Sequence, residues 1–142
     1  MKNNYMNQIN VLQNNFNIQL AKKFEHKIDN QLTAKQVLLL ELIKVGVTST
    51  KDLADKLNVS TSAISQILNK LQHKGYIERS INPKNRREIV LQLADKAHQY
   101  FNDLASLKDE INREIYGKLS LEDLEQLKNI LEKLQVIVQE NH

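Results

Sequence analysis

The sequence predicts a mainly α-helical fold with one small β-hairpin wing, arranged as a winged helix-turn-helix with additional helices at its N- and C-termini. Three observations predict it. Apolar residues recur at helical spacing along most of the 142 residues. Capping residues and glycines fall where those helices should begin and end. Only residues 76–93 switch to the two-residue period of β-strands.

Helix boundaries are marked by signals at both ends. Three hydroxyl residues have an amide or acidic residue three positions later, which is the spacing of a capping box; they are Thr33, Ser49 and Ser120. Each glycine follows an apolar stripe, and we expect each to close a helix in the left-handed conformation; they are Gly46, Gly75 and Gly117. The predicted helices cover about residues 4–27, 33–45, 50–57, 60–74, 94–116 and 120–139.

Composition excludes several kinds of chemistry. The sequence has no cysteine, so disulfides, thiolate metal sites and cysteine nucleophiles are excluded. The four histidines are not at metal-ligand spacing, and no glycine-rich phosphate loop or nucleophile elbow occurs. We therefore expect no enzymatic activity and no cofactor. Without a signal-peptide pattern or an apolar run that could span a bilayer, we expect a cytoplasmic protein with no membrane partner.

The net charge of +3 is unevenly distributed. Between Asn69 and Arg87, six Lys and Arg residues stand against a single acid, Glu78. Solvated helix faces also produce local charge, and they are the alternative interpretation. A stretch this cationic is what neutralisation of DNA phosphates requires.

Residues 50–74 have the pattern of two short helices joined by a tight turn. Ala54 is small enough for the two helices to cross closely. Asn58 tolerates the turn conformation, Val59 fills the turn from inside, and Ser60 caps the second helix. The sequence therefore predicts a helix-turn-helix here.

The second helix of this pair has a distinctive outer face. Ile64, Leu68 and Leu71 are expected to face the core. The outward side chains are small or hydrogen-bonding groups, which suit base edges in the major groove. An ordinary solvated face is the alternative, but such faces carry more Glu and Lys and fewer of these poorer helix formers. With the cap included, the candidate DNA-reading residues are Ser60, Thr61, Ser62, Ser65, Gln66, Asn69 and Lys70.

The hairpin supplies a second set of candidate contacts. Two alternating segments, 76–81 and 87–93, flank a turn that contains the only proline. Lys84, Arg86 and Arg87 gather at its tip. These cations could enter a narrow minor groove or clamp phosphates. Alternatively, one arginine braces the loop through a carboxylate.

The terminal segments carry apolar stripes that a winged-helix core does not need. In the last helix the stripe comprises Leu121, Leu124, Leu127, Leu131, Leu134 and Val138, widened by Ile130 and Ile137. In the first it comprises Met6, Ile9, Leu12, Phe16, Leu20 and Phe24. Such faces need a partner, which favours a two-fold homodimer over packing within the monomer.

Residues 32–93 resemble the winged-helix core of the multiple-antibiotic-resistance regulator (MarR) family. The resemblance is carried by the segments Leu32-Thr33-x-x-Gln36, Leu53-Ala54-x-x-Leu57-x-Val59-Ser60, Lys74-Gly75-Tyr76-Ile77-Glu78-Arg79 and Asn82-Pro83-x-Asn85-Arg86-Arg87. The family's wing usually reads Asp-Pro-x-Asp-Arg-Arg. Here Asn82 and Asn85 replace both acids, which makes the tip more cationic and removes the usual carboxylate brace.

The resemblance implies a sequence-specific DNA-binding transcriptional regulator, a repressor that binds double-stranded DNA at a palindromic operator as a homodimer. It also implies release by a small-molecule effector, for which Phe16, Phe24, Tyr100 and Phe101 are candidate lining residues; plain core packing is the alternative. The implied organisation is an N-terminal dimerisation helix (1–31), a winged helix-turn-helix (32–93) and C-terminal dimerisation helices (94–142). Two other functions remain open, a winged-helix module that binds protein and an architectural or replication-initiator protein.

Overall fold

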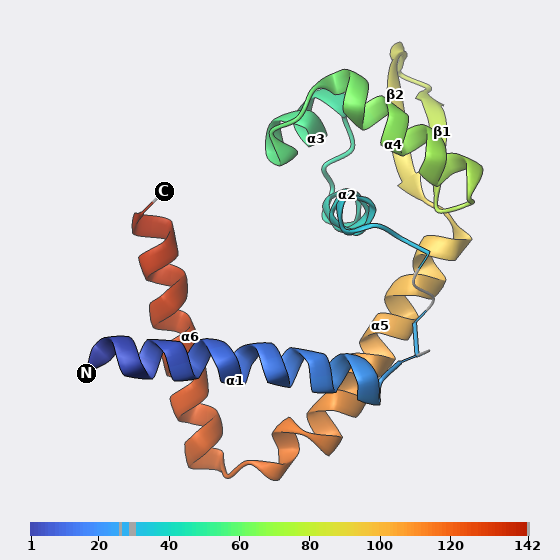
Figure 1. Ribbon diagram of the computed structural model, residues 1–142. Helices are drawn as coiled ribbons and strands as arrows, with labels where there is room; N and C mark the ends of the chain where they lie inside the picture. The colour runs from blue at the N-terminus through green and yellow to red at the C-terminus, as the bar shows by residue number, and fades with distance from the viewer. Residues whose placement is uncertain (26, 29–30, 142) are drawn as a thin grey trace. The chain divides into compact units, whose positions relative to one another are not determined.

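The computed structural model describes residues 1–25, 27–28 and 31–141, and it describes residues 86–88 by their backbone alone. The described chain is mainly helical with one hairpin, which confirms the predicted fold class (Figure 1). The elements are α1 (Lys2–Lys23), α2 (Ala34–Lys44), α3 (Thr50–Leu57), α4 (Thr61–His73), β1 (Ile77–Asn82), β2 (Asn85–Leu93), α5 (Asp95–Glu114), a short 3-10 helix η1 (Tyr116–Lys118) and α6 (Leu121–Glu140).

Two compact units divide the chain, residues 1–104 and residues 105–142. The first contains a single hydrophobic core, built from α2, α3, α4 and the hairpin and joined by Ala97 of α5. In Figure 1, α4 lies beside the hairpin. The most deeply buried large side chains in this core are Leu39, Leu40, Leu53, Ile64, Leu68, Leu71 and Ile77.

The predicted N-terminal caps are present in the structure. Thr33 Oγ1 accepts from the Gln36 N–H at 3.2 Å, and Gln36 Oε1 accepts from the Thr33 N–H at 2.9 Å, so α2 begins with a complete capping box. Ser49 and Ser120 accept from the backbone N–H groups three residues on, at 3.0 and 3.1 Å. Local pattern therefore predicted these helix starts to within one residue.

Helix ends follow the prediction at two glycines and depart from it at the third. Gly46 and Gly75 have φ angles of +101° and +89°, and each closes its helix in the left-handed conformation. Gly117 does not; it lies inside η1, and α5 has already ended at Glu114. A Cβ at Gly117 would stand 2.8 Å from the Asn112 carbonyl oxygen, so this glycine permits a close backbone approach instead.

The first helix also ends earlier than expected. We expected it to continue to Lys27, but α1 ends at Lys23. Phe24 leaves helical geometry, with φ −108° and ψ 21°, and its side chain is buried. The chain therefore turns where the aromatic ring enters the interior.

The hairpin is longer and its turn tighter than predicted. β1 and β2 pair antiparallel, with Ile77 opposite Leu93 and Asn82 opposite Asn85, and the register shifts between Ile81 and Asn82. Only Pro83 and Lys84 lie between the strands. The expected four-residue turn is therefore a two-residue one.

The apolar stripes of α1 and α6 remain largely exposed within the chain. Neither helix contains a buried residue. The exposed large apolar side chains on α1 include Met6, Ile9, Leu12 and Phe16, and those on α6 include Leu121, Ile130, Leu131, Leu134, Ile137 and Val138. Among the described residues, none of the helices combines the length and hydropathy that a bilayer crossing requires.

Candidate nucleic-acid interface

The turn between α3 and α4 is built as its residue types predict. Asn58 adopts the left-handed conformation, with φ 53° and ψ 48°. The Val59 N–H donates to the Ala54 carbonyl at 3.1 Å, and the Val59 side chain packs against the core. Leu53 and Ala54 are buried where the two helices meet. This turn sets the angle at which α4 leaves α3, and so decides which face of α4 is outermost.

The inner and outer faces of α4 separate as expected. Ile64, Leu68 and Leu71 are each at most 1% exposed. Of the predicted reading residues, Ser65 is half-buried, and the others on this helix are exposed: Ser60, Thr61, Ser62, Gln66, Asn69 and Lys70. The outer face therefore offers a continuous run of hydrogen-bonding groups.

The N-terminal end of α4 favours an anion. Ser60 Oγ accepts from the Ala63 N–H at 3.0 Å, which leaves its hydroxyl hydrogen available to an outside acceptor. The first turn contains no acidic residue, and Lys70 and His73 lie in the last turn. The partial positive charge of a helix N-terminus is therefore not neutralised by side chains here, as a phosphate contact requires.

One contact on this face was not predicted. Arg79 of β1 donates from Nη1 to Asn69 Oδ1 of α4, at 2.8 Å. The alternation of the strand places Arg79 on the same side as buried Ile77, and so toward α4. The alternation of the strand was visible in the sequence, but it predicts only the side of the hairpin on which Arg79 lies and not the residue that it contacts.

The wing tip has an internal brace that does not use a carboxylate. Asn82 Oδ1 accepts from the Lys84 N–H at 3.0 Å, which closes the turn in the manner of an Asx-turn. Lys84 is exposed beside it. The backbone of Arg86 and Arg87 belongs to β2, but their side chains lie outside the described residues, so the roles expected of them stay predictions.

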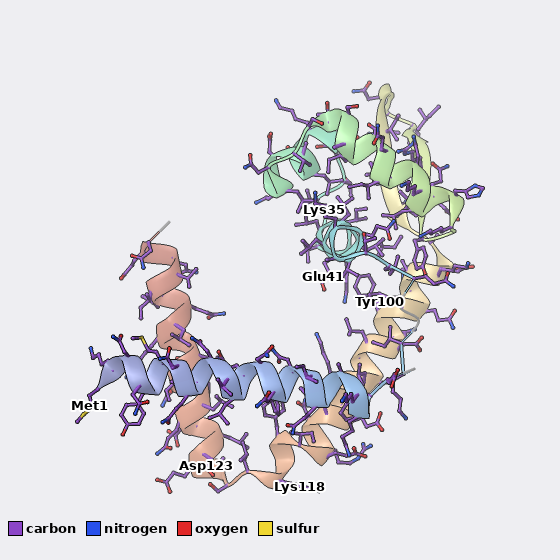
Figure 2. All side chains as sticks on the ribbon, viewed as in Figure 1. Met1, Lys35, Glu41, Tyr100, Lys118 and Asp123 are labelled. Carbon is purple, nitrogen blue, oxygen red and sulfur yellow. The ribbon has the colours of Figure 1, made fainter. Side chains whose placement is uncertain are left out.

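A second candidate site lies where α2 and α5 approach each other. Tyr100 and Phe101 make an edge-to-face contact with ring centroids 5.4 Å apart, and Lys44 Nζ lies 4.5 Å from the centroid of Phe101. Burial raises the pKa of the Tyr100 hydroxyl above its usual 10.0, and the nearby Glu41 carboxylate raises it further (Figure 2). Tyr100 is therefore a neutral hydrogen-bonding group at physiological pH.

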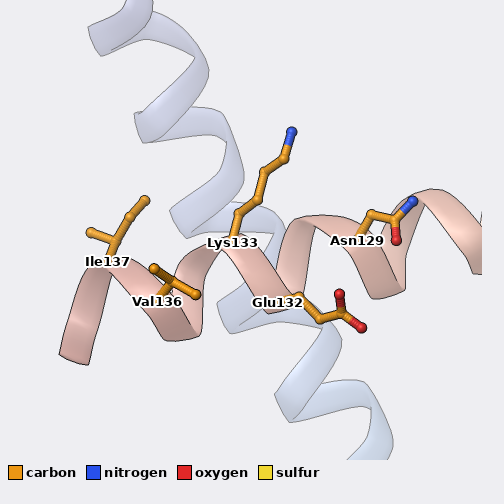
Figure 3. A pocket seen from close by; sticks show the side chains of 5 residues that line it. All are labelled: Asn129, Glu132, Lys133, Val136 and Ile137. Carbon is orange, nitrogen blue, oxygen red and sulfur yellow. The ribbon is translucent and has the colours of Figure 1, made fainter. Parts of the chain in front are cut away.

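Beside Tyr100 is a small pocket of about 110 Å³. Its lining residues are Ile28, Tyr76, Lys96, Gln99, Tyr100 and Asp103. Two of the predicted effector-lining residues are at this pocket, because Tyr100 lines it and Phe101 packs on Tyr100. The other two are not among its lining residues: Phe24 is buried, and Phe16 lines a separate hollow on α1. A further open hollow is lined by residues of α6 alone, and Figure 3 shows their side chains: Asn129, Glu132, Lys133, Val136 and Ile137.

Two helices joined by a tight turn, followed by an antiparallel hairpin, define the winged helix-turn-helix class of proteins. Residues 32–89 match the model of the MarR family, so the winged-helix part of the chain is similar to that family.

Two curated relatives and one solved structure are similar to this chain. The Bacillus subtilis protein named as uncharacterized HTH-type transcriptional regulator YfiV is 32% identical, over 55% of this chain and 48% of its own length. The HTH-type transcriptional repressor MdtR of the same organism is 29% identical, over 71% of this chain and 65% of its own length. This chain thus spans about half to two thirds of these relatives. Streptococcus pneumoniae FabT, solved in complex with DNA, shares the fold with a TM-score of 0.75 and 21% identity, over 97% of this chain and 99% of that one.

Proposed function

We propose that this chain is a cytoplasmic, sequence-specific DNA-binding transcriptional regulator of the repressor type, without enzymatic activity of its own. The observation that carries the proposal is the exposed outer face of α4, which is free of acids and rich in hydroxyl and amide groups. Beside it stands a wing whose tip carries Lys84 together with Arg86 and Arg87. Two similar proteins support the same function, since MdtR is named as a transcriptional repressor and FabT was solved in complex with DNA.

Each exposed group on the outer face of α4 has a proposed role in DNA binding. Thr61 and Ser62, in the first turn, are placed to meet phosphates or bases near the helix N-terminus. Gln66 and Asn69 are the side chains with enough reach and two-sided hydrogen bonding to specify a base. Lys70 and the wing cations would supply the salt-dependent part of the affinity.

The proposed assembly is a homodimer that binds a palindrome. A single winged helix reads one half-site, and a two-fold operator needs two such helices a fixed distance apart. The exposed apolar stripes of α1 and α6 support this assembly, because a monomer would leave them in water. We propose that residues 1–31 and 94–142 form the dimer interface and that residues 32–93 bind DNA.

Selection of bound sequences from a random pool of duplexes tests the proposal, followed by fluorescence anisotropy against the selected site at several salt concentrations. We expect one palindromic motif and an affinity that falls steeply with salt. Lys70→Ala should weaken binding and lower the salt slope. Lys128→Ala, which removes an exposed cation paired with Glu132 on α6, is the matched control and should leave both unchanged.

Other outcomes assign other functions. Salt-dependent binding with no selected motif would indicate an architectural protein. Absence of DNA binding at low salt would refute the proposal and leave a protein-interaction module. Assembly is measured separately by sedimentation. Leu134→Lys should convert a dimer to a monomer if this half-exposed residue lies in the interface, while Lys133→Ala on the same turn should not.

We further propose that the pocket beside Tyr100 takes the effector. Its size, about 110 Å³, is below the 300 Å³ or so at which drug-sized pockets begin, so it suits a compact ligand. Two tyrosines supply aromatic walls, and the lining carries one cation, Lys96, and one carboxylate, Asp103. We propose a small aromatic carboxylate whose charged group is held by Lys96. Benzoate should release the protein from its operator, and Lys96→Met should raise the benzoate concentration required. If wild type and Lys96→Met are released at the same benzoate concentration, the effector binds elsewhere.

A further inference from the structure

The hydrogen bond between the wing strand and α4 restricts what Asn69 can do. A guanidinium group has donors only, so the atom of Asn69 that Arg79 contacts at 2.8 Å must be the amide oxygen. The bond joins a charged donor to a neutral acceptor, and such bonds are short and stronger than neutral ones. Arg79 itself is half-buried, which limits the freedom of the guanidinium.

Holding the oxygen turns the other side of the amide outward. The amide is planar, so when Oδ1 is directed at Arg79 the two N–H groups of Nδ2 project away from it. Within the described part of the chain, Nδ2 of Asn69 donates to no protein acceptor, and the residue is exposed. Lys70, the next residue, is also a pure donor. This stretch of α4 therefore presents hydrogen-bond donors to an incoming ligand.

We propose that Arg79 is a specificity-determining positioning residue that makes Asn69 a donor, so that Asn69 reads guanine at its operator position and not adenine. Asparagine recognises adenine bidentately, with its oxygen accepting from the N6 amino group and its nitrogen donating to N7. In this chain Arg79 occupies one lone pair of that oxygen and holds the oxygen toward the wing, so the amide nitrogen is the side presented to a base. Guanine presents two acceptors, O6 and N7, and both fit a donor. The inference rests on the proposed function, because it names the base that the same helix face selects.

Gln66 provides a contrast on the same helix face. It is exposed three residues before Asn69, and its side chain donates no hydrogen bond within the described residues. No interaction of its amide with Arg79 is present there. Both ends of the Gln66 amide are therefore open to a base, and adenine suits it. Two amide side chains of the same chemistry thus read different bases because one of them has a partner on the wing.

The test measures base preference at single operator positions for the wild type and four variants. Wild type should prefer guanine over adenine at one position in each half-site. Arg79→Met keeps the aliphatic stem and removes the donors, so it frees the oxygen and should move the guanine-to-adenine ratio toward adenine by about tenfold. Asn69→Asp keeps an acceptor for Arg79 but has no donors, and should lose the guanine preference. Gln66→Ala should alter a different position and leave this ratio unchanged.

The outcomes separate this inference from the proposed function. If Arg79→Met weakens binding to all sequences equally, lowers the salt slope and leaves the ratio unchanged, Arg79 is a phosphate contact and the inference is wrong while the proposed function stands. If wild type selects no sequence, both fail. Thermal unfolding verifies that Arg79→Met folds, and Arg79→Lys, which retains the charge, should give an intermediate ratio.

A measurement without DNA tests the contact itself. In the free protein, the side-chain amide resonances of Asn69 should shift in Arg79→Met, because the charged partner of the oxygen is lost. Those of Gln66 should stay in place. Unchanged Asn69 resonances would overturn the inference regardless of any effect on DNA binding.

Discussion

Ser60 combines a structural role with a proposed contact, and substitutions can separate the two. Its hydroxyl oxygen caps α4 by accepting from the Ala63 N–H at 3.0 Å. Ser60→Ala removes that acceptor and should lower the free energy of unfolding by about 1 kcal/mol. For a chain of this size the melting temperature should fall by roughly 2–4 °C. Ser60→Asp retains an acceptor at a helix N-terminus, where a negative charge is favourable, and should be at least as stable as wild type.

The two Ser60 variants should rank differently in DNA affinity than in stability. If the first turn of α4 frays in Ser60→Ala and must re-form to bind, the loss of about 1 kcal/mol limits the fall in affinity to about fivefold per subunit. A larger fall would mean that the hydroxyl itself touches DNA. Ser60→Asp should bind much more weakly than wild type despite its stability, because it brings a carboxylate to the proposed phosphate contact.

Urea denaturation and anisotropy on the same preparations measure both effects. Ser49→Ala is the matched control, because Ser49 makes the same 3.0 Å cap at the start of α3. It should cost similar stability with a smaller loss of affinity. Ser60→Asp as unstable as Ser60→Ala would refute the cap, and Ser60→Asp with undiminished affinity would refute the placement of this helix end against phosphate.

Four further substitutions test the packing of the fold and the titration of Tyr100. Leu68→Ala removes a side chain that is 1% exposed, and chemical denaturation should show a loss of about 3 kcal/mol; a loss below 1 kcal/mol would contradict full burial. Gly46→Ala has open space around the new methyl group and should cost only the left-handed backbone penalty of about 1–2 kcal/mol, whereas Gly117→Ala meets the Asn112 carbonyl at 2.8 Å and should be destabilising without any such penalty; equal tolerance at Gly117 and at an exposed helix position would refute the close approach. Because the pKa of Tyr100 is raised in the folded protein, the phenol ionises first in the unfolded chain, and the contribution of Tyr100 to the free energy of unfolding is full below pH 10 and is lost as the pH rises above it. Tyr100→Phe should therefore flatten the decline in stability at alkaline pH. An identical decline in this variant would show that the Tyr100 hydroxyl is not desolvated.

Local features of this fold were predictable because their causes are local. The caps at Thr33, Ser49 and Ser120 depend on residues three positions apart, and the left-handed ends at Gly46 and Gly75 depend on the missing Cβ. The third glycine was misjudged for a physical reason. Gly117 is required by the carbonyl of Asn112, a contact through space that an apolar stripe followed by glycine does not reveal.

In the candidate site too, features with local causes were predictable and contacts between distant segments were not. Helical periodicity was enough to separate the buried face of α4 from its exposed face, because one turn of a helix fixes that geometry. The bond from Arg79 to Asn69 was not predictable, because it depends on how the hairpin docks against α4. Strand alternation identified the face of Arg79, but only the packing of Ile77 and its neighbours brings that face to within hydrogen-bonding distance of Asn69.

The wing turn is closed by a side-chain oxygen whether the residue is an acid or an amide, but the charge of the turn differs between the two. The family's usual acids at positions 82 and 85 are asparagines here, and the turn is still closed by a side-chain oxygen, because an amide carbonyl accepts a backbone N–H as a carboxylate does. What differs is charge. A carboxylate in this turn would subtract from the positive potential around Lys84, whereas Asn82 closes the turn and subtracts nothing. Turn closure and the charge of the turn residues, which an acid would couple, are thus independent in this chain.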